Sequence, residues 1–269
     1  MSLARTTVEP GVVRLRMSGW RGRAVGYDVS AYLLDGVLVD SGFPHARREL
    51  MRVVDDVRPR GAIITHWHED HAGNVEALAE AGVPLWMDAE CERTLRDRPA
   101  IRAYRRMVWG RPPRLVSEPT RFDPAPLELI ATPGHTADHR VVWDASRRMV
   151  VSSDLFLGVK VRVAHEHESP RALVESLRTI AALEPRVLLD AHRGVVTDAA
   201  AQLRAKLAWT EETIGEIEAL GARGLDARAI VRRLFGGESL AGRLSGGEYS
   251  RTAFVRAVLR EAGVGGGDR

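Results

Sequence analysis

The sequence predicts an α/β protein in which two β-sheets pack between helices, followed by a helical C-terminal segment. Up to residue 196, short alternating or wholly apolar runs typical of strands are interleaved with stretches of helical periodicity. Beyond Thr197 every pattern is helical. A chain of 269 residues is long enough for one large domain with an appendage. We therefore predict a main domain of residues 1–196 and a helical segment of residues 197–269.

The predicted strands end in tight turns or run into polar clusters. Residues 29–34 and 36–40 are expected to form a hairpin that turns at Asp35-Gly36, a dipeptide typical of two-residue turns. Residues 61–65 form a short, mostly apolar strand that leads directly into a histidine cluster. The remaining predicted strands are residues 12–17, 83–87, 127–131, 140–144, 149–154 and 186–190.

Helices are expected where apolar residues recur every three or four positions. In residues 45–57, Leu50, Val53 and Val54 share one face. Ser250 is a candidate N-cap for the last helix. The predicted helices are residues 45–57, 72–81, 170–183, 199–220, 225–235 and 252–262.

Residues 88–118 differ from their surroundings because arginines crowd them. We interpret this stretch as one or two helices with a loop, inserted between strands of the main domain. Its arginines, together with Tyr104 and Trp109, could track a phosphate backbone, but a solvated helix is favoured. The arginines are Arg93, Arg96, Arg98, Arg102, Arg105, Arg106, Arg111 and Arg114.

Composition limits the setting more than the function. The formal net charge is only +3, and Lys160 and Lys206 are the only lysines, an arginine bias that a G+C-rich genome produces and that does not by itself indicate nucleic acid. The single cysteine, Cys91, excludes an intramolecular disulfide. No run approaches the roughly 18 apolar residues of a membrane span, and the N-terminus lacks the apolar core of a secretory signal. We expect a cytoplasmic protein without a membrane partner; a homodimer stays open.

The chemistry concentrates in His66-Trp67-His68-Glu69-Asp70-His71. Imidazole nitrogen and carboxylate oxygen are the ligands that zinc and similar divalent ions prefer. Four ligand-type residues in one turn are too many for a single tetrahedral ion that keeps an open position. The cluster therefore predicts two ions that share a site.

Further ligands are expected at other strand ends. His135 follows the strand 127–131, Asp154 ends the strand 149–154, and His192 follows the strand 186–190. Because a sandwich gathers its loops at strand ends, these side chains could complete a set of six or seven ligands. His165 and His167 could also pass for a ligand pair, but the neighbouring Glu166 and Glu168 favour a solvated loop.

Five segments resemble, in order, the five motifs of the metallo-β-lactamase superfamily. They are residues 37–42 (Val-Leu-Val-Asp-Ser-Gly), 65–71, 132–136 (Thr-Pro-Gly-His-Thr), Ser153-Asp154 and Ala191-His192. The resemblance covers roughly residues 12–195 and implies a four-layer αββα sandwich with metals at one edge of the sheets. Within the family, the chain looks like the small glyoxalase II-like or endoribonuclease-like hydrolases.

The resemblance also implies a ligand set. His66, His68 and His135 would hold the first ion, Asp70, His71 and His192 the second, and Asp154 would bridge both. The ions would be zinc in the first place, with iron or manganese as alternatives. Asp40 would orient a ligand rather than bind metal, and Thr65, Thr136 and His139 are candidates for similar supporting roles.

Two positions depart from the family pattern. The last motif usually ends in glycine after the histidine, whereas this chain has Arg193, which places a long cation beside the second ion. Asp138 stands where the third motif often has glycine. Arg193 is therefore a candidate substrate-binding residue, together with Lys160, Tyr104 and Trp109.

The resemblance implies a hydrolase that uses a metal-bridging hydroxide, because bound divalent ions lower the pKa of water from 15.7 towards about 7. Asp70 would orient the nucleophile and carry its proton. A small-molecule thioester or other carboxylic ester or lactone is the favoured substrate. The alternatives are an endoribonuclease or phosphodiesterase acting on RNA, and a persulfide dioxygenase with one iron. An inactive binding module is disfavoured because every ligand position is filled.

Overall fold

The computed structural model describes residues 2–19 and 28–264. Contacts divide the chain into two compact units. The first unit holds residues 1–131, 138–154 and 186–197, and the second holds residues 132–137, 155–185 and 198–269. Each unit is therefore assembled from segments that are distant in the sequence.

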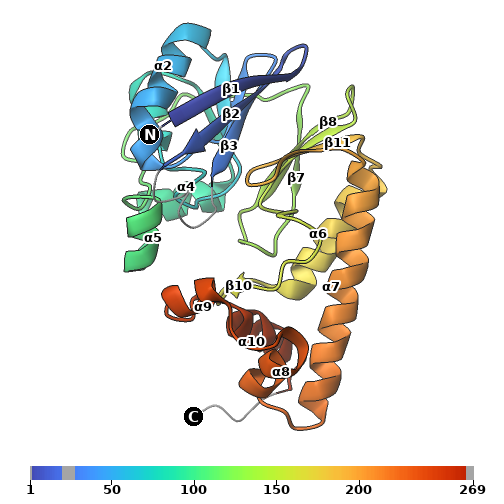
Figure 1. Ribbon diagram of the computed structural model, residues 1–269. Coiled ribbons are helices and arrows are strands. Elements are labelled where there is room, and N and C mark those ends of the chain that lie inside the picture. The colour runs from blue at the N-terminus through green and yellow to red at the C-terminus, as the bar shows by residue number, and fades with distance from the viewer. Residues whose placement is uncertain (1, 20–27, 265–269) are drawn as a thin grey trace. The chain divides into compact units, whose positions relative to one another are not determined.

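Two β-sheets form the centre of the first unit (Figure 1). The first sheet is antiparallel over its first four strands, and two parallel strands extend it. Its strands, in spatial order, are β1 (Ser2–Glu9), β2 (Val12–Ser18), β3 (Val29–Leu34), β4 (Val37–Val39), β5 (Gly61–Ile64) and β6 (Leu85–Met87).

The second sheet has five strands, and one of its four neighbouring pairs is parallel. That pair joins β11 to β9, so the ends of these two strands lie at the same edge of the sheet. The spatial order is β12 (Gly194–Val196), β11 (Val187–Asp190), β9 (Met149–Ser153), β8 (Arg140–Asp144) and β7 (Glu128–Ala131).

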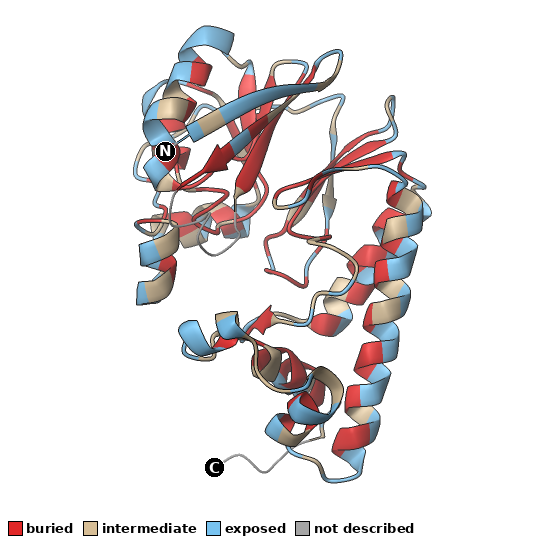
Figure 2. Ribbon diagram, viewed as in Figure 1, coloured by how far each residue is buried: buried red, intermediate tan, exposed pale blue. Residues whose placement is uncertain are grey.

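Strand β3 shows how the sequence builds the layers. Tyr32 and Leu34 belong to a buried cluster shared with the second sheet, and Ala31 and Leu33 belong to a cluster shared with helices. Side chains alternate between faces along a strand, so an entirely apolar strand serves two cores at once. Figure 2 shows the inner strands of this unit as largely buried and the edge strand β1 as largely exposed.

Helices cover the outer face of the first sheet. Leu50, Leu78 and Leu95 place α2 (Arg47–Val57), α3 (Val75–Glu80) and α4 (Ala89–Arg96) in the same cluster as Ala31 and Leu33. A short 3-10 helix η1 (Pro44–Ala46) precedes α2, and α5 (Ala103–Val108) follows α4. The first unit thus contains three successive layers: helices, sheet and sheet.

The second unit is mainly helical. Its long helix α7 (Ala199–Ala222) contacts α6 (Pro170–Ala182), and α10 (Arg251–Glu261) contacts both α7 and α8 (Ala227–Phe235). Ile217, Ile230 and Val255 are fully buried where these helices meet. The unit also contains α9 (Leu240–Leu244) and a two-stranded sheet of β10 (Ala164–His165) and β13 (Tyr249–Ser250).

The long amphipathic helices and the apolar strands fall where the sequence predicts them, and the hairpin turns at Asp35-Gly36 as expected. The Oγ of Ser250 accepts from Ala253 N at 2.9 Å, which confirms the predicted N-cap. Strand β1 was not predicted, because it is a largely exposed edge strand whose apolar residues do not alternate. The expectation of helices alone beyond Thr197 is wrong for β13, whose two residues are too few to show a period.

No helix in the described ranges has both the length and the apolar character that a membrane crossing requires.

The carboxylate of Glu238 binds the start of α10. It accepts from the backbone N–H groups of Ser239, Arg251 and Thr252 at 2.8–3.0 Å and from the Thr252 hydroxyl at 2.8 Å. Partial burial acts to raise the pKa of Glu238, but these donors outweigh it and lower the pKa from 4.5 to about 2.

Glu238→Gln should therefore lower stability in a pH-dependent way. A depressed pKa contributes stability above pH 4.5, and that stability disappears as the pH falls towards 2. We expect a loss of about 1 kcal/mol at pH 7, limited by solvent screening, and no loss near pH 2. Urea unfolding of the full chain between pH 2 and pH 7 measures this change in the free energy of unfolding. The exposed Glu212→Gln serves as control. An equal loss at both pH values would contradict the assignment.

Candidate metal centre

The turn that carries the histidine cluster follows β5 directly and is held by backbone hydrogen bonds. His71 N and Ala72 N both donate to His68 O, at 3.0 and 2.8 Å. Ser41 donates to His71 O from its backbone N (2.7 Å) and from its hydroxyl (2.8 Å). His66, His68, Asp70 and His71 are all buried in this turn. A short stretch of sequence thus brings four ligand-type side chains together.

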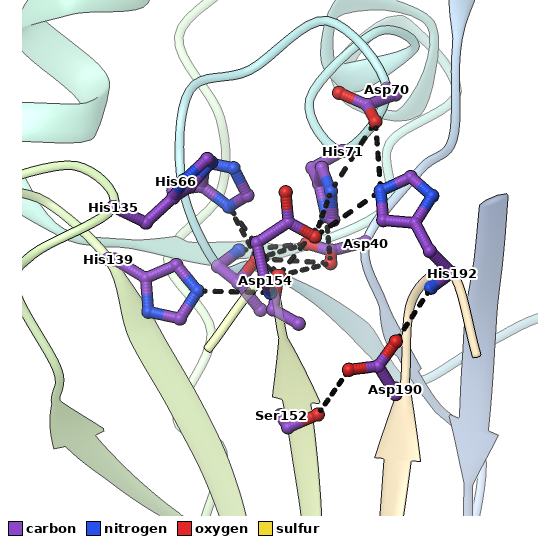
Figure 3. A network of polar contacts seen from close by, with 12 residues as sticks. Asp40, His66, Asp70, His71, His135, His139, Ser152, Asp154, Asp190 and His192 are labelled. Atoms are coloured by element: carbon purple, nitrogen blue, oxygen red, sulfur yellow. Dashed lines mark hydrogen bonds and ion pairs between the residues drawn. The ribbon is translucent and has the colours of Figure 1, made fainter. Parts of the chain in front are cut away.

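One group of facing ligand atoms consists of the Nε2 atoms of His71 and His192 and the carboxylate of Asp70, and Asp154 Oδ1 faces the same two nitrogens (Figure 3). His71 Nε2 lies 3.3 Å from Asp154 Oδ1 and 3.7 Å from Asp70 Oδ2. His192 Nε2 lies 3.4 Å from the same atom of each aspartate. The strand ends of β5, β9 and β11 supply these side chains.

Hydrogen bonds fix how both imidazoles are oriented. Nδ1 of His71 donates to Asp40 Oδ2 at 2.8 Å, and Nδ1 of His192 donates to the backbone carbonyl of Asp28 at 2.9 Å. A neutral imidazole that donates from Nδ1 presents a lone pair at Nε2. Both Nε2 atoms therefore face the two carboxylates in a buried space, and each can offer a lone pair once its proton is lost.

The spacing of these ligand atoms suits a divalent cation. Ligand atoms about 2.0–2.2 Å from a tetrahedral zinc ion lie roughly 3.3–3.6 Å from one another, close to the four distances found here. The donors, imidazole nitrogen and carboxylate oxygen, are those that zinc-like ions prefer. The residues thus fit a metal site in both geometry and chemistry.

The electrostatics of the group point the same way. Burial acts to lower the pKa of His71, but Asp154, Asp70 and Asp40 outweigh it and raise the pKa well above the ordinary value. Burial likewise acts to lower the pKa of His192, and Asp154 and Asp70 raise it well above normal. The carboxylates therefore stabilise positive charge at the two imidazoles, and either protons or a bound cation can supply that charge.

A second set of ligand atoms lies beside the first. His66, His68 and Asp154 each offer one atom within 4.8 Å of the others. Nδ1 of His66 faces the hydroxyls of Thr65 (3.2 Å) and Ser153 (3.5 Å). Asp154 belongs to both sets, since its Oδ1 also faces His71 and His192.

Asp40 binds two residues of the site through its carboxylate. Its carboxylate accepts from Thr65 N (2.9 Å), from the Thr65 hydroxyl (2.9 Å) and from His71 Nδ1. Asp40 and Ser153 both adopt left-handed φ angles, 64° and 46°, which few non-glycine residues do. Such backbone geometry is concentrated where a site must hold side chains in fixed directions.

The predicted supporting residue His139 and two aspartates that were not predicted to have such a role also bind segments of the site. His139 accepts from Asp154 N at 3.3 Å, through Nε2, so it holds the backbone of that aspartate. Asp138, which departs from the family pattern, accepts from Trp67 N at 2.9 Å. Asp190 accepts from His192 N (2.9 Å) and Arg193 N (2.7 Å), which fixes the loop that carries His192.

His135 and Thr136 lie in the loop 132–137, which belongs to the second unit. Both are buried, and Nδ1 of His135 lies 3.3 Å from Glu168 Oε1. Glu168 also accepts from His165 N at 2.9 Å. The assignment of His135 to the first ion stays a prediction, as does a supporting role for Thr136.

The candidate substrate residues are dispersed. The Trp109 ring lies 6.2 Å from the His192 ring, between centroids, and 5.6 Å from Phe43. Tyr104 is half-buried on α5, Arg193 is exposed beside His192, and Lys160 is exposed in the second unit. Trp109 therefore lies next to a candidate ligand.

Sequence reasoning missed two buried carboxylates. Glu69, inside the cluster 66–71, binds Arg105, and Glu168 binds His135. The expectation of a solvated loop over residues 165–168 is wrong for His165 and Glu168, which are both largely buried. Neither pairing has a signal in the sequence, because the partners are distant along the chain and no short motif joins them.

Comparisons with known proteins agree with the site. The model of the metallo-beta-lactamase superfamily matches residues 24–192. A beta-lactamase-like protein 2 homolog from Caenorhabditis elegans is 28% identical over 171 residues, which are 60% of this chain and 52% of the relative. The chain thus spans about half the length of that curated relative.

Solved structures extend the likeness over nearly the whole chain. A metallo-beta-lactamase family protein from Thermus thermophilus has a TM-score of 0.70 and 20% identity, covering 96% of this chain and 95% of its own. A metallo-beta-lactamase from Pontibacter korlensis has a TM-score of 0.60 and 17% identity, covering 78% of this chain and 99% of its own. These likenesses show the fold.

The fold and the His/Asp clusters define a metal-binding α/β sandwich of the αββα type with a helical C-terminal segment. The chain belongs to the metallo-β-lactamase superfamily, whose members are typically hydrolytic enzymes.

Proposed function

We propose that this protein is a metal-dependent hydrolase that holds two divalent ions, most simply Zn²⁺, and cleaves a thioester or another carboxylic ester or lactone. His66, His68 and His135 would hold one ion and Asp70, His71 and His192 the other, with Asp154 between them. When bound, the ions supply a nucleophile at neutral pH by lowering the pKa of coordinated water towards about 7.

The observation that carries the proposal is the convergence at Asp70 and Asp154. Two imidazole Nε2 atoms, with their tautomers set by Asp40 and the carbonyl of Asp28, face these carboxylates at 3.3–3.7 Å. Each Nδ1 is already bonded, to Asp40 or to the carbonyl of Asp28, so both Nε2 atoms are left to face the carboxylates, where a bound cation can take the place of their protons.

The residues of the chain suit an acyl substrate. Asp70 is the carboxylate to which we assign the proton transfer, and its Oδ2 lies 3.7 Å from His71 Nε2 and 3.4 Å from His192 Nε2. Trp109, beside His192, offers an aromatic surface for the apolar part of an acyl group. Neither the absence of lysine from the first unit nor the long C-terminal helices select one substrate class, because the same fold serves many reactions.

The arginine-rich stretch lends less support to RNA than its composition suggests. Arg93, Arg96 and Arg105 lie within ion-pair distance of Glu90, Glu92 and Glu69 respectively. Arginines whose charges are met within the chain contribute less to a phosphate-tracking surface. These ion pairs therefore favour a small acyl substrate over RNA.

The test is a hydrolysis panel on zinc-loaded protein, with acyl-thioesters, aryl esters, lactones, a phosphodiester and short RNA. We expect thioester or lactone turnover that a chelator removes and added zinc restores. Turnover of RNA or the phosphodiester alone would overturn the substrate class. Hydrolysis of none, with persulfide oxidation by iron-loaded protein, would overturn the reaction.

A further inference from the structure

A buried ion pair lies next to the candidate metal centre without belonging to either ligand group. Arg105 Nε donates to Glu69 Oε1 and Arg105 Nη2 to Glu69 Oε2, both at 2.6 Å. Glu69 is fully buried, and Arg105 is 5% exposed. Two parallel hydrogen bonds of this kind fix the guanidinium and the carboxylate in one plane.

Such a pair is costly to bury, so its position matters. Moving two charges out of water costs several kcal/mol per ion, which attraction and hydrogen bonds must offset. An apolar contact would hold α5 to the turn at less cost. What the ion pair adds is direction, because bidentate geometry allows one arrangement of the two side chains.

Arg105 also contacts a second residue of the same turn. Its guanidinium carbon lies 5.5 Å from the centre of the Trp67 ring. Trp67 and Glu69 alternate with the candidate ligands His66, His68 and Asp70 along the chain. One arginine thus holds the two non-ligand side chains between the three ligands.

The helix that carries Arg105 reaches the centre at another point. Trp109, at the C-terminal end of α5, lies beside His192 and Phe43 with its ring tilted by about 45° to each of theirs. The α5 segment therefore contacts the turn 66–71 through Arg105 and the loop of His192 through Trp109.

We propose that Arg105 is a positioning residue that, through Glu69, orders the turn 66–71 before metal binds. The metal part of this inference rests on the proposed function. The ordering of the turn does not, since it concerns contacts within the chain. The arginine-rich stretch, interpreted from sequence as a nucleic-acid surface or a solvated helix, would then support the metal site.

Hydrogen exchange on metal-free protein tests the ordering directly. The amides of His71 and Ala72 donate to His68 O and report whether the turn is closed. We expect Arg105→Gln and Glu69→Gln to speed exchange at these amides at least tenfold, while the strand amides of β3 stay protected. Unchanged protection of the turn in folded Arg105→Gln would overturn the proposal.

Zinc affinity, measured by competition with a chromogenic chelator, is the second readout. We expect each single variant to bind zinc 10–100-fold more weakly, as for other outer partners of metal ligands. The double variant Glu69→Gln/Arg105→Gln leaves no buried charge unpaired and guards against misfolding. The loss of zinc affinity in the double variant should be no larger than that in either single variant, because the two residues act as a unit.

Arg96→Gln is the matched control. Arg96 lies on α4 in the same stretch and pairs with Glu92 at 2.9 Å, but its side chain is 30% exposed. It should change neither readout. If Arg105→Gln speeds exchange in the turn but the wild-type protein binds no zinc, the role of the ion pair stands and the proposed function is overturned. If folded Arg105→Gln keeps the zinc affinity of the wild type, the role of the ion pair in metal binding is overturned.

Discussion

Replacing Asp70 by asparagine should lower kcat by roughly 10²–10⁴-fold while the fold is retained, the range expected when a group that carries a proton is lost. The substitution keeps the shape of the side chain and removes its charge. The remaining amide can no longer accept the proton, and it leaves His71 and His192 without one of the two carboxylates that they face. Steady-state kinetics on the best substrate, with circular dichroism to verify folding, measures the effect.

Asp56→Asn is a suitable control for this experiment. Its carboxylate is 64% exposed and pairs with Arg5 at 2.6 Å on the surface of the first unit. It should leave kcat within about twofold, because exposed ion pairs contribute little. Wild-type turnover in Asp70→Asn would exclude Asp70 from the reaction.

Asp40→Ala should have the second largest effect, on metal binding rather than on chemistry. Three donors lose their acceptor at once: the backbone N–H and the hydroxyl of Thr65, and Nδ1 of His71. With its tautomer no longer fixed, His71 should bind metal 10–100-fold more weakly. The orphaned buried donors should also lower the free energy of unfolding by about 1–3 kcal/mol.

Asp40→Asn separates the two effects. An asparagine oxygen can still accept from Thr65, but the amide cannot accept from both Thr65 and His71 as the carboxylate does. Stability should recover further than zinc affinity, as measured by thermal unfolding and chelator competition on the same preparations. Full recovery of zinc affinity in Asp40→Asn would show that orientation of His71 by a charged group is unnecessary.

Much of the candidate site was predictable because its residues lie in a few short segments of the sequence. Asp70 and His71 lie in the turn after the apolar strand β5, and His192 lies two residues beyond the end of the buried strand β11. Strand ends in a sandwich meet at one edge, so ligand-type residues in those positions converge without any long-range knowledge.

Long-range pairings could not be predicted in the same way. Glu69 and Arg105 are 36 positions apart, and Arg105 is one of eight similar arginines in its stretch. Which arginine is buried depends on how the short helix α5 packs, and that packing leaves no period in six residues. Strand β1 escaped prediction for a related reason, since pairing with β2 rather than burial forms it.

The most direct test of the central claim is the metal content of zinc-loaded, dialysed protein, measured by mass spectrometry for wild type and Asp154→Ala. Asp154 faces both imidazoles of one group and belongs to the other. The account predicts two ions per chain in the wild type and one or fewer in the variant. A wild-type chain that retains no divalent ion, or a variant that retains two, would contradict it.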